Sequence, residues 1–152
     1  MPEAVIVATA RSPIGRAFKG SLVSLRPDDM ATQIVRAVLD KVPNLDPGLV
    51  EDLIMGNAQP AGEAGYNLGR VVAILAGLPH VPGTTVNRYC SSSLQTIRMA
   101  AHAIKAGEGD VFIAAGVEAV SRFSQGMSDG GPDTQNPLFD DSRKRTENRA
   151  LG

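Results

Sequence analysis

Short apolar runs alternate with longer amphipathic segments along most of the chain. The runs are rich in aliphatic and β-branched residues, as is typical of strands, and lie at residues 4–9, 53–56, 83–87 and 111–115. The amphipathic segments carry aliphatic residues at helical spacing and predict helices at residues 28–41, 67–76 and 91–106. Because strands that alternate with helices need crossover connections, the pattern predicts an α/β fold with a mainly parallel sheet and helices on its faces.

The texture of the sequence changes after Arg122. Residues 124–136 are dense in Gly, Ser, Asp, Asn and Pro, and residues 140–149 form a run of mixed charge. Such a composition is typical of a solvated loop or an exposed helix. We therefore expect an α/β unit followed by a segment of different character.

The single cysteine, Cys90, stands between a predicted strand and a predicted helix. A strand-to-helix turn places a side chain next to the unpaired N–H groups and the positive dipole end of the helix. That setting favours the thiolate, which is the reactive form of cysteine. A small buried residue without chemistry is also a common role for a lone cysteine, so its position alone leaves both interpretations open.

Composition narrows the class of protein. The 152 residues are 43% hydrophobic and 20% charged, with a formal net charge of −1, so no dominant basic face is available for nucleic acid. One cysteine cannot form an internal disulfide, and the N-terminus lacks the pattern of a signal peptide. The apolar stretches are too short to span a bilayer. We therefore expect a cytoplasmic protein that binds neither nucleic acid nor membranes.

Other candidate sites have weaker support. Residues 15–21 (GRAFKGS) superficially suggest a phosphate loop, but their lysine stands before the second glycine, whereas that motif needs it after. His102 would lie roughly 18 Å along a helix from Cys90, at ~1.5 Å per residue, which is too far for a base. Spacing does not exclude His80, although a structural or surface role fits it better. One cysteine and two scattered histidines offer no zinc site.

The sequence around the cysteine resembles a known family. Residues 86–104 (VNRYCSSSLQTIRMAAHAI) resemble the acyl-enzyme cysteine signature of the thiolases, with a hydrophobe and Asn before the cysteine and small residues after it. Further segments resemble thiolase motifs in the same order, at residues 11–15 (RSPIG), 65–70 (GYNLGR), 76–79 (AGLP) and 115–121 (AGVEAVS). The chain departs from the family pattern at Ser93, where glycine is commoner. It departs again in the last segment, where two glycines and a methionine near Val120 are commoner.

The resemblance implies a fold and a division of the chain. Thiolases have a five-layer αβαβα architecture built from two similar halves, and this chain resembles most of the first half. We therefore expect residues 1–121 to form an incomplete N-terminal half-domain. Residues 122–152 would be the start of the loop domain, which in thiolases contributes to acyl-CoA binding and tetramer contacts. The chain would then stop inside that insertion.

The resemblance also implies chemistry for Cys90. In thiolases this cysteine attacks a 3-ketoacyl-CoA at its keto carbon, and CoA then collects the acyl group from sulfur. The reverse reaction is the Claisen condensation of two acetyl-CoA molecules. The backbone N–H of Cys90 would be one donor of an oxyanion hole. The activating histidine and a second cysteine come from the other half of a thiolase, so residues 1–152 would not hold the full catalytic set.

The same resemblance implies partners. Acyl-CoA and CoA would bind as substrates in fatty acid metabolism, with no permanently bound cofactor and no metal, and the protein would form a homodimer or homotetramer. Two alternatives remain. A non-catalytic or scaffold member of the fold would bind acyl-CoA or a partner chain, and the missing base and Ser93 would suit it. A ketosynthase-like condensing enzyme would use carrier-protein substrates, although residues 11–15 and 65–70 favour a thiolase.

Overall fold

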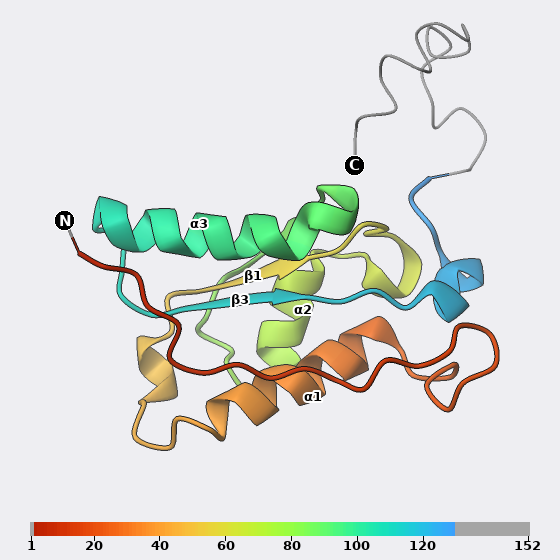
Figure 1. Cartoon of the computed structure of the whole chain (residues 1–152), viewed down its shortest axis with the longest axis horizontal. Helices are drawn as coiled ribbons and strands as arrows, with labels where there is room; N and C mark the ends of the chain where they lie inside the picture. Colours follow the sequence, from red (N-terminus) through yellow and green to blue (C-terminus); the bar gives the residue numbers. More distant parts are fainter. Residues whose placement is uncertain (1, 130–152) are drawn as a thin grey trace, which may run out of the picture.

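The computed structural model describes residues 2–129, which form a parallel sheet with helices on both faces (Figure 1). The helices and strands follow the order α1 Pro27–Leu39, β1 Asp52–Gly56, α2 Leu68–Leu75, β2 Gly83–Val86, α3 Ser92–Ala106 and β3 Phe112–Gly116. Short 3₁₀ turns, η1 to η4, lie at Pro47–Leu49, Gly62–Ala64, Tyr89–Ser91 and Val120–Gln125. The three predicted helices and the last three predicted strands are confirmed, with ends that shift by one or two residues.

The sheet has β1 at its centre, with the strand order β2-β1-β3 and both pairings parallel. In the register, Leu53 of β1 lies opposite both Gly83 of β2 and Ile113 of β3. Helix α3 covers one face of the sheet, and α1 and α2 cover the other (Figure 1). Because all three strands are parallel, their carboxyl ends meet at one edge, where ligands of open α/β sheets usually bind.

The main core lies between the sheet and the helices α1 and α2. Leu53 and Met55 of β1 are fully buried and belong to one cluster with Val35 of α1 and Leu68 of α2. Side chains alternate across a strand, so Ile54 is buried on the opposite face, which α3 covers. Burial on both faces is typical of the central strand of a parallel sheet and explains why β1 is apolar without interruption from Leu53 to Met55.

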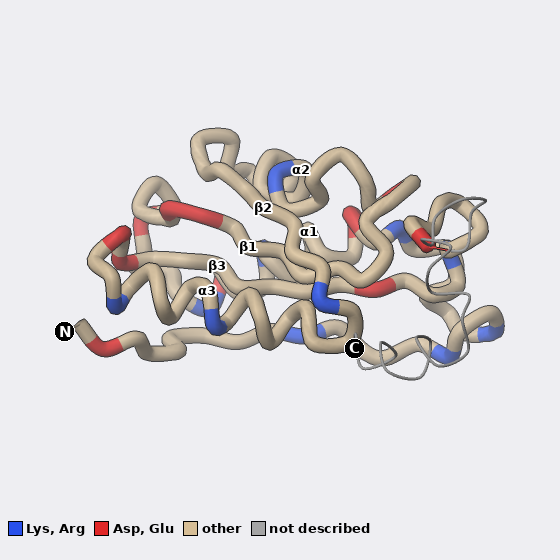
Figure 2. The backbone as a smooth tube through the Cα atoms, turned by 90° about the horizontal axis from the view of Figure 1, so that it is seen from above, with Lys and Arg blue, Asp and Glu red and all other residues tan. Residues whose placement is uncertain are grey.

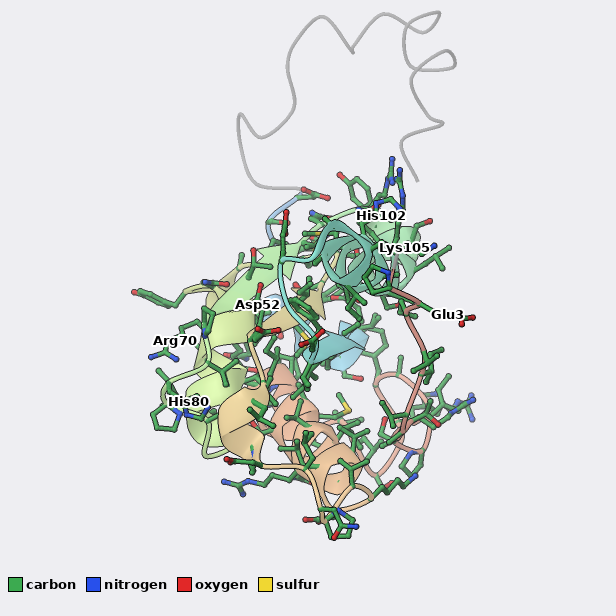
Figure 3. All side chains as sticks on the ribbon, turned by 90° about the vertical axis from the view of Figure 1, so that its left-hand side faces the viewer. Glu3, Asp52, Arg70, His80, His102 and Lys105 are labelled. Carbon is green, nitrogen blue, oxygen red and sulfur yellow. The ribbon has the colours of Figure 1, made fainter. Side chains whose placement is uncertain are left out.

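The apolar run at residues 4–9 predicts a strand, but that prediction is wrong. The segment pairs with no strand in the described structure, and Val5, Ile6 and Val7 are between 69% and 83% exposed. It runs along the side of β3 that faces away from β1 (Figures 1 and 3), where Lys41 Nζ donates a 2.6 Å hydrogen bond to Thr9 O. The local pattern is compatible with a strand, but pairing depends on tertiary context, and the run lies beside β3 without forming a strand pairing with it.

Charged residues are interspersed along the backbone (Figure 2). The longest helix among residues 2–129 is α3, with 15 residues, and no helix in that range has the length and apolar character needed to cross a membrane.

Candidate active site

Cys90 lies at the carboxyl end of β2, in the 3₁₀ turn η3 that leads into α3. The predicted strand-to-helix turn is therefore confirmed, although the α-helix begins at Ser92, two residues after the cysteine. Cys90 is exposed and unpaired. An exposed position at the carboxyl edge of the sheet is typical of a residue that contacts a substrate and is not typical of a core residue.

The turn is held by its own hydrogen bonds. The buried Ser92 accepts a 2.8 Å bond at Oγ from the Arg88 N–H and donates a 2.6 Å bond to Tyr89 O. The Ser91 N–H donates to Arg88 O at 3.0 Å. Within residues 2–129, the Cys90 N–H has no hydrogen-bond acceptor. This N–H is therefore available to a bound group.

The start of α3 sits unusually close to the sheet. A Cβ built on Gly56, the last residue of β1, would lie 2.7 Å from the Ser92 carbonyl carbon and from the Ser93 nitrogen, so only glycine allows this approach. One turn further on, the fully buried Thr96 donates from Oγ1 to Ser93 O at 2.7 Å and lies 3.2 Å from Ala115 O of β3. The Cys90 turn is thus fixed to all three strands, since β2 leads directly into it.

Polar residues follow the carboxyl end of each strand. Asn57, after β1, donates from its backbone N–H to Val86 O at 3.0 Å and from Nδ2 to Val117 O at 2.8 Å. Glu118, after β3, accepts the Ala58 N–H at Oε2 over 2.8 Å. The Glu118 residue is exposed as a whole, but loss of water around its carboxyl group raises its pKa, and the Ala58 hydrogen bond partly offsets that rise.

The segment after β3 folds back over this edge. Its Asp129 accepts a 3.0 Å bond at Oδ2 from Gln59 Nε2, and the Asp129 N–H donates to Gln59 Oε1 at 3.0 Å. A hydrogen bond to Asp129, together with its negative charge, raises the pKa of the Tyr89 hydroxyl. Nearer β3, Arg122 makes a two-pronged ion pair with Glu63 of η2. The segments that follow β1 and β3 therefore lie beside the turn that contains Cys90.

Neither histidine lies at the carboxyl edge. His80 precedes β2, at the end of the strand opposite Cys90, and its Nε2 lies 3.2 Å from Pro47 O. His102 lies near the C-terminal end of α3. Figure 3 looks onto the end of the molecule where the strands begin and shows both histidines there, together with Asp52. No group of three or more potential metal ligands occurs among residues 2–129.

A hollow of about 540 Å³ lies away from Cys90, among α1, η2 and η4. Its lining includes Arg26, Glu63, Tyr66 and Gln125. The cysteine lines neither this hollow nor the small cavity beside Asn57.

Comparison with known proteins decides the family. The model of the family described as "Thiolase, N-terminal domain" matches residues 4–138. The chain belongs to the thiolase family. The predicted α/β thiolase-like fold and the resemblance of residues 4–121 are confirmed by this match, which continues past β3 into the segment of different composition.

Similar proteins include full-length thiolases from bacteria. The chain is 46% identical over 143 residues to the 3-oxoadipyl-CoA/3-oxo-5,6-dehydrosuberyl-CoA thiolase of Escherichia coli K12, covering 92% of this chain and 35% of that protein. It is 49% identical over 123 residues to the 3-ketoacyl-CoA thiolase of Bacillus subtilis, covering 80% and 31%. It is 47% identical over 133 residues to the β-ketoadipyl-CoA thiolase of Acinetobacter baylyi, covering 86% and 33%. The chain thus spans about a third of the length of these thiolases.

Some polar residues of this thiolase chain had no role assigned from sequence. Asn57 and Glu118 each follow the end of a parallel strand by one or two residues. That position was a usable signal, because polar residues just after parallel strands lie at the ligand-binding edge. Asn87 and Glu118 stand inside motifs that resemble thiolases, but both bond Ala58, just after β1, which sequence reasoning did not connect to them.

Proposed function

We propose that this chain belongs to an acyl-CoA acyltransferase of the thiolase type, in which Cys90 accepts the acyl group. The observation that carries the proposal is an exposed, unpaired cysteine on a strand-to-helix turn, at the carboxyl edge of the sheet of a thiolase-family chain. An exposed thiol can reach a substrate, and sulfur is an effective nucleophile toward an acyl carbon.

The proposed reaction is acyl transfer in two steps. The Cys90 thiolate forms a bond to the keto carbon of a 3-ketoacyl-CoA, and the bond between the keto carbon and the α-carbon breaks. The electron pair leaves with the α-carbon, which takes up a proton to give acetyl-CoA. CoA then loses its thiol proton, attacks the acyl carbon and displaces the Cys90 thiolate. The proton released by CoA balances the proton taken up by acetyl-CoA, and the reverse sequence condenses two acetyl-CoA molecules.

The backbone around Cys90 has a role in this proposal. Negative charge develops on the carbonyl oxygen when sulfur attacks, and a donor aimed at that oxygen lowers the barrier. The Cys90 N–H, which has no acceptor among residues 2–129, is the donor that we propose. Loss of one such donor typically costs about 10²- to 10³-fold in rate.

The proposed substrate class is a 3-ketoacyl-CoA thioester. Relatives of comparable identity are named for 3-ketoacyl-CoA in one case and for 3-oxoadipyl-CoA or β-ketoadipyl-CoA in others. These names share a 3-keto thioester of CoA and differ in the acyl group. We therefore propose the shared chemistry without an acyl chain length. Steady-state assays in both directions with short, long and dicarboxylic 3-ketoacyl-CoAs would measure the preference for the acyl group.

The test of the nucleophile is a brief incubation of the full-length protein with acetyl-CoA, followed by peptide mass spectrometry. We expect an acetyl group on the peptide that contains Cys90, and its loss when CoA is added. Cys90→Ala should carry no acetyl group at this site, and Ser91→Ala, a neighbouring change that keeps the thiol, should still be acetylated. Acyl groups elsewhere with Cys90 unmodified would overturn the assignment.

Two other experimental results would favour a different function for the protein. Binding of acyl-CoA without any acyl transfer would favour a non-catalytic member of the fold. Activity confined to carrier-protein thioesters would favour a ketosynthase-like enzyme. We propose CoA as a substrate, no permanently bound cofactor, and a cytoplasmic homodimer or homotetramer, which sedimentation of the full-length protein would measure.

The division of the chain at residue 121 is likewise a proposal. Residues 122–129 fold back onto Gln59 and Glu63, and residues 130–152 lie outside the described residues. If residues 122–152 begin a loop domain that helps bind acyl-CoA, exchange of that segment for the one of a relative should change acyl-group preference without abolishing Cys90 acetylation.

A further inference from the structure

Hydrogen bonds connect the segments that follow the three strands, next to the turn that contains Cys90. Glu118 Oε2 accepts the Ala58 N–H over 2.8 Å, and Ala58 O accepts from Asn87 Nδ2 over 3.1 Å. Asn87 Oδ1 in turn accepts the Tyr89 N–H over 2.9 Å. These contacts run from the second residue after β3, across the backbone of the second residue after β1, to the residue before Cys90. We call Glu118, Ala58 and Asn87 the strand-end network.

The network ends on a strained residue. Tyr89 has a φ of 47°, in the left-handed region that non-glycine residues seldom adopt. The Asn87 side chain bonds the N–H of this same residue, and the next residue along the chain is Cys90. A residue in this conformation persists only where its surroundings hold it. The direction in which the chain enters Cys90 therefore depends on Asn87.

We infer that Asn87 and Glu118 are positioning residues for Cys90, which set the orientation of its thiolate and its backbone N–H through the backbone of Ala58. This inference rests on the proposed function, because it concerns the geometry of the cysteine that accepts the acyl group. Neither side chain hydrogen-bonds Cys90 itself. Each acts on the turn through the backbone of another strand.

The burial of the two side chains argues against a purely structural role. Asn87 and Glu118 are both exposed, so neither contributes much apolar burial to the fold. Yet both bond to backbone groups of the central strand's exit, 29 and 60 residues away in the chain. Crowding that removes water from the Glu118 carboxyl also strengthens its bond to the Ala58 N–H. Two exposed side chains that bond the backbone of the same residue, Ala58, suit control of geometry.

The test uses the full-length protein with Asn87→Ala, Glu118→Ala, Glu118→Gln and the double variant Asn87→Ala/Glu118→Ala. The rate of Cys90 acetylation by acetyl-CoA is measured in a single turnover, with kcat and KM in steady state. We expect each alanine variant to lower the acetylation rate and kcat by about 10- to 100-fold with little change in KM, since a misplacement of about 1 Å can cost 10²-fold. Glu118→Gln keeps an oxygen for the Ala58 N–H and should recover most of the rate.

The double variant separates a network from two independent effects. If Glu118 acts through Ala58 and Asn87, the double variant should be no slower than the slower single variant, whereas independent losses would multiply. Gln95→Ala is the matched control, because Gln95 bonds the Arg88 side chain of the same turn and touches no backbone group there. Alanine variants with the acetylation rate of the unmodified protein would overturn the inference, as would equal losses in Glu118→Gln and Glu118→Ala.

A second readout separates this inference from the proposed function. The rate of Cys90 alkylation by iodoacetamide is followed across pH in the same variants, since this needs no substrate. If the unmodified protein takes no acetyl group at Cys90, the proposed function fails. The pH profile of the alkylation rate still tests the strand-end network. Asn87→Ala and Glu118→Ala should shift this profile in the same direction, whereas Glu118→Gln and Gln95→Ala should leave it unchanged. Unshifted profiles in both alanine variants would overturn the network.

Discussion

The Cβ of Ser93, in the first turn of α3, occupies the space beside Gly116, the last residue of β3. A Cβ built on Gly116 would lie 2.6 Å from the Ser93 Cβ and 3.5 Å from the Ser93 Cα. The first distance is far below van der Waals contact, and the second is an ordinary contact. The two positions therefore share room for one side chain, and Ser93 fills it where thiolases more often carry glycine.

Gly116→Ala should destabilise the protein by about 1–3 kcal/mol, because an added methyl in a packed contact forces the helix start away from the strand. Ser93→Gly in the same protein should restore most of that loss, since the clash is with the serine Cβ. Urea denaturation of the two single variants and the double variant measures the coupling.

The single variant Ser93→Gly is the control for this pair. We expect it to cost about 0.5–1 kcal/mol by itself, as glycine does in a helix. If the double variant is as unstable as the sum of the singles, Ser93 and Gly116 do not compete for space and the relationship fails.

Thr96→Val should destabilise the protein by about 1–3 kcal/mol. The change keeps the shape of a fully buried side chain but removes the hydroxyl that contacts Ser93 O and Ala115 O. Thr96→Ser keeps the hydroxyl and loses only a methyl group, at about 0.8 kcal/mol for one buried carbon. Thermal melting compares both variants with the unmodified protein, and a valine variant as stable as the unmodified protein would show that the hydroxyl contributes nothing.

The cost of Glu63→Gln should depend on pH. A hydrogen bond from Arg122 lowers the pKa of Glu63, the charges of Arg122 and Arg26 act in the same direction, and burial and Asp28 oppose them. A lowered pKa in the folded state gives stability that is present above the ordinary value of 4.5 and is lost as pH falls through the folded-state value. Glu63→Gln should therefore destabilise at pH 7, and the difference should shrink in acid.

Urea denaturation of Glu63→Gln at pH 7 and below pH 4.5 makes this comparison. Glu108→Gln, which removes an exposed carboxylate that forms no ion pair among residues 2–129, controls for the lost charge. A difference that stays constant or grows toward low pH would contradict the assigned sign.

Sequence patterns located most of the fold because its signals are local. The β-branched residues of β2 and the spacing of apolar residues in α3 need no information from elsewhere in the chain. The run at residues 4–9 carries the same local signal as β1, yet only β1 has strands on both sides. Strand pairing is a property of the assembled sheet, so no periodicity within the run could separate the two.

The candidate site was predictable in part for the same reason. Cys90 was located from its turn, since strand, turn and helix follow one another in sequence. The roles of Asn87 and Glu118 depend on Ala58, which lies 29 residues from one and 60 from the other. To connect them, one needs to know that β1 lies between β2 and β3, an order that the sequence does not state.

The 152-residue chain expressed by itself should self-associate through α3. Leu94 and Ile97 lie one helical turn apart and are 68% and 46% exposed. Burying either side chain is worth roughly 1.5–3 kcal/mol, so Leu94→Lys/Ile97→Lys should weaken association by about tenfold or more. Sedimentation at several concentrations measures this. Ile14→Lys, which changes an apolar residue that is 93% exposed outside α3, is the control, and an equal effect there would refute a role for α3.

The central position of β1 has a consequence for synthesis. Its residue Asp52 pairs beside Phe112, so one flank of the strand has no partner until 60 more residues have been made. At about 5–20 residues per second on a ribosome, that interval is roughly 3–12 seconds. The most buried strand of the sheet spends those seconds with an unpaired edge, half of them before β2 has arrived on the other flank. The nascent chain therefore passes through a period in which capture by a chaperone competes with completion of the sheet that will carry Cys90.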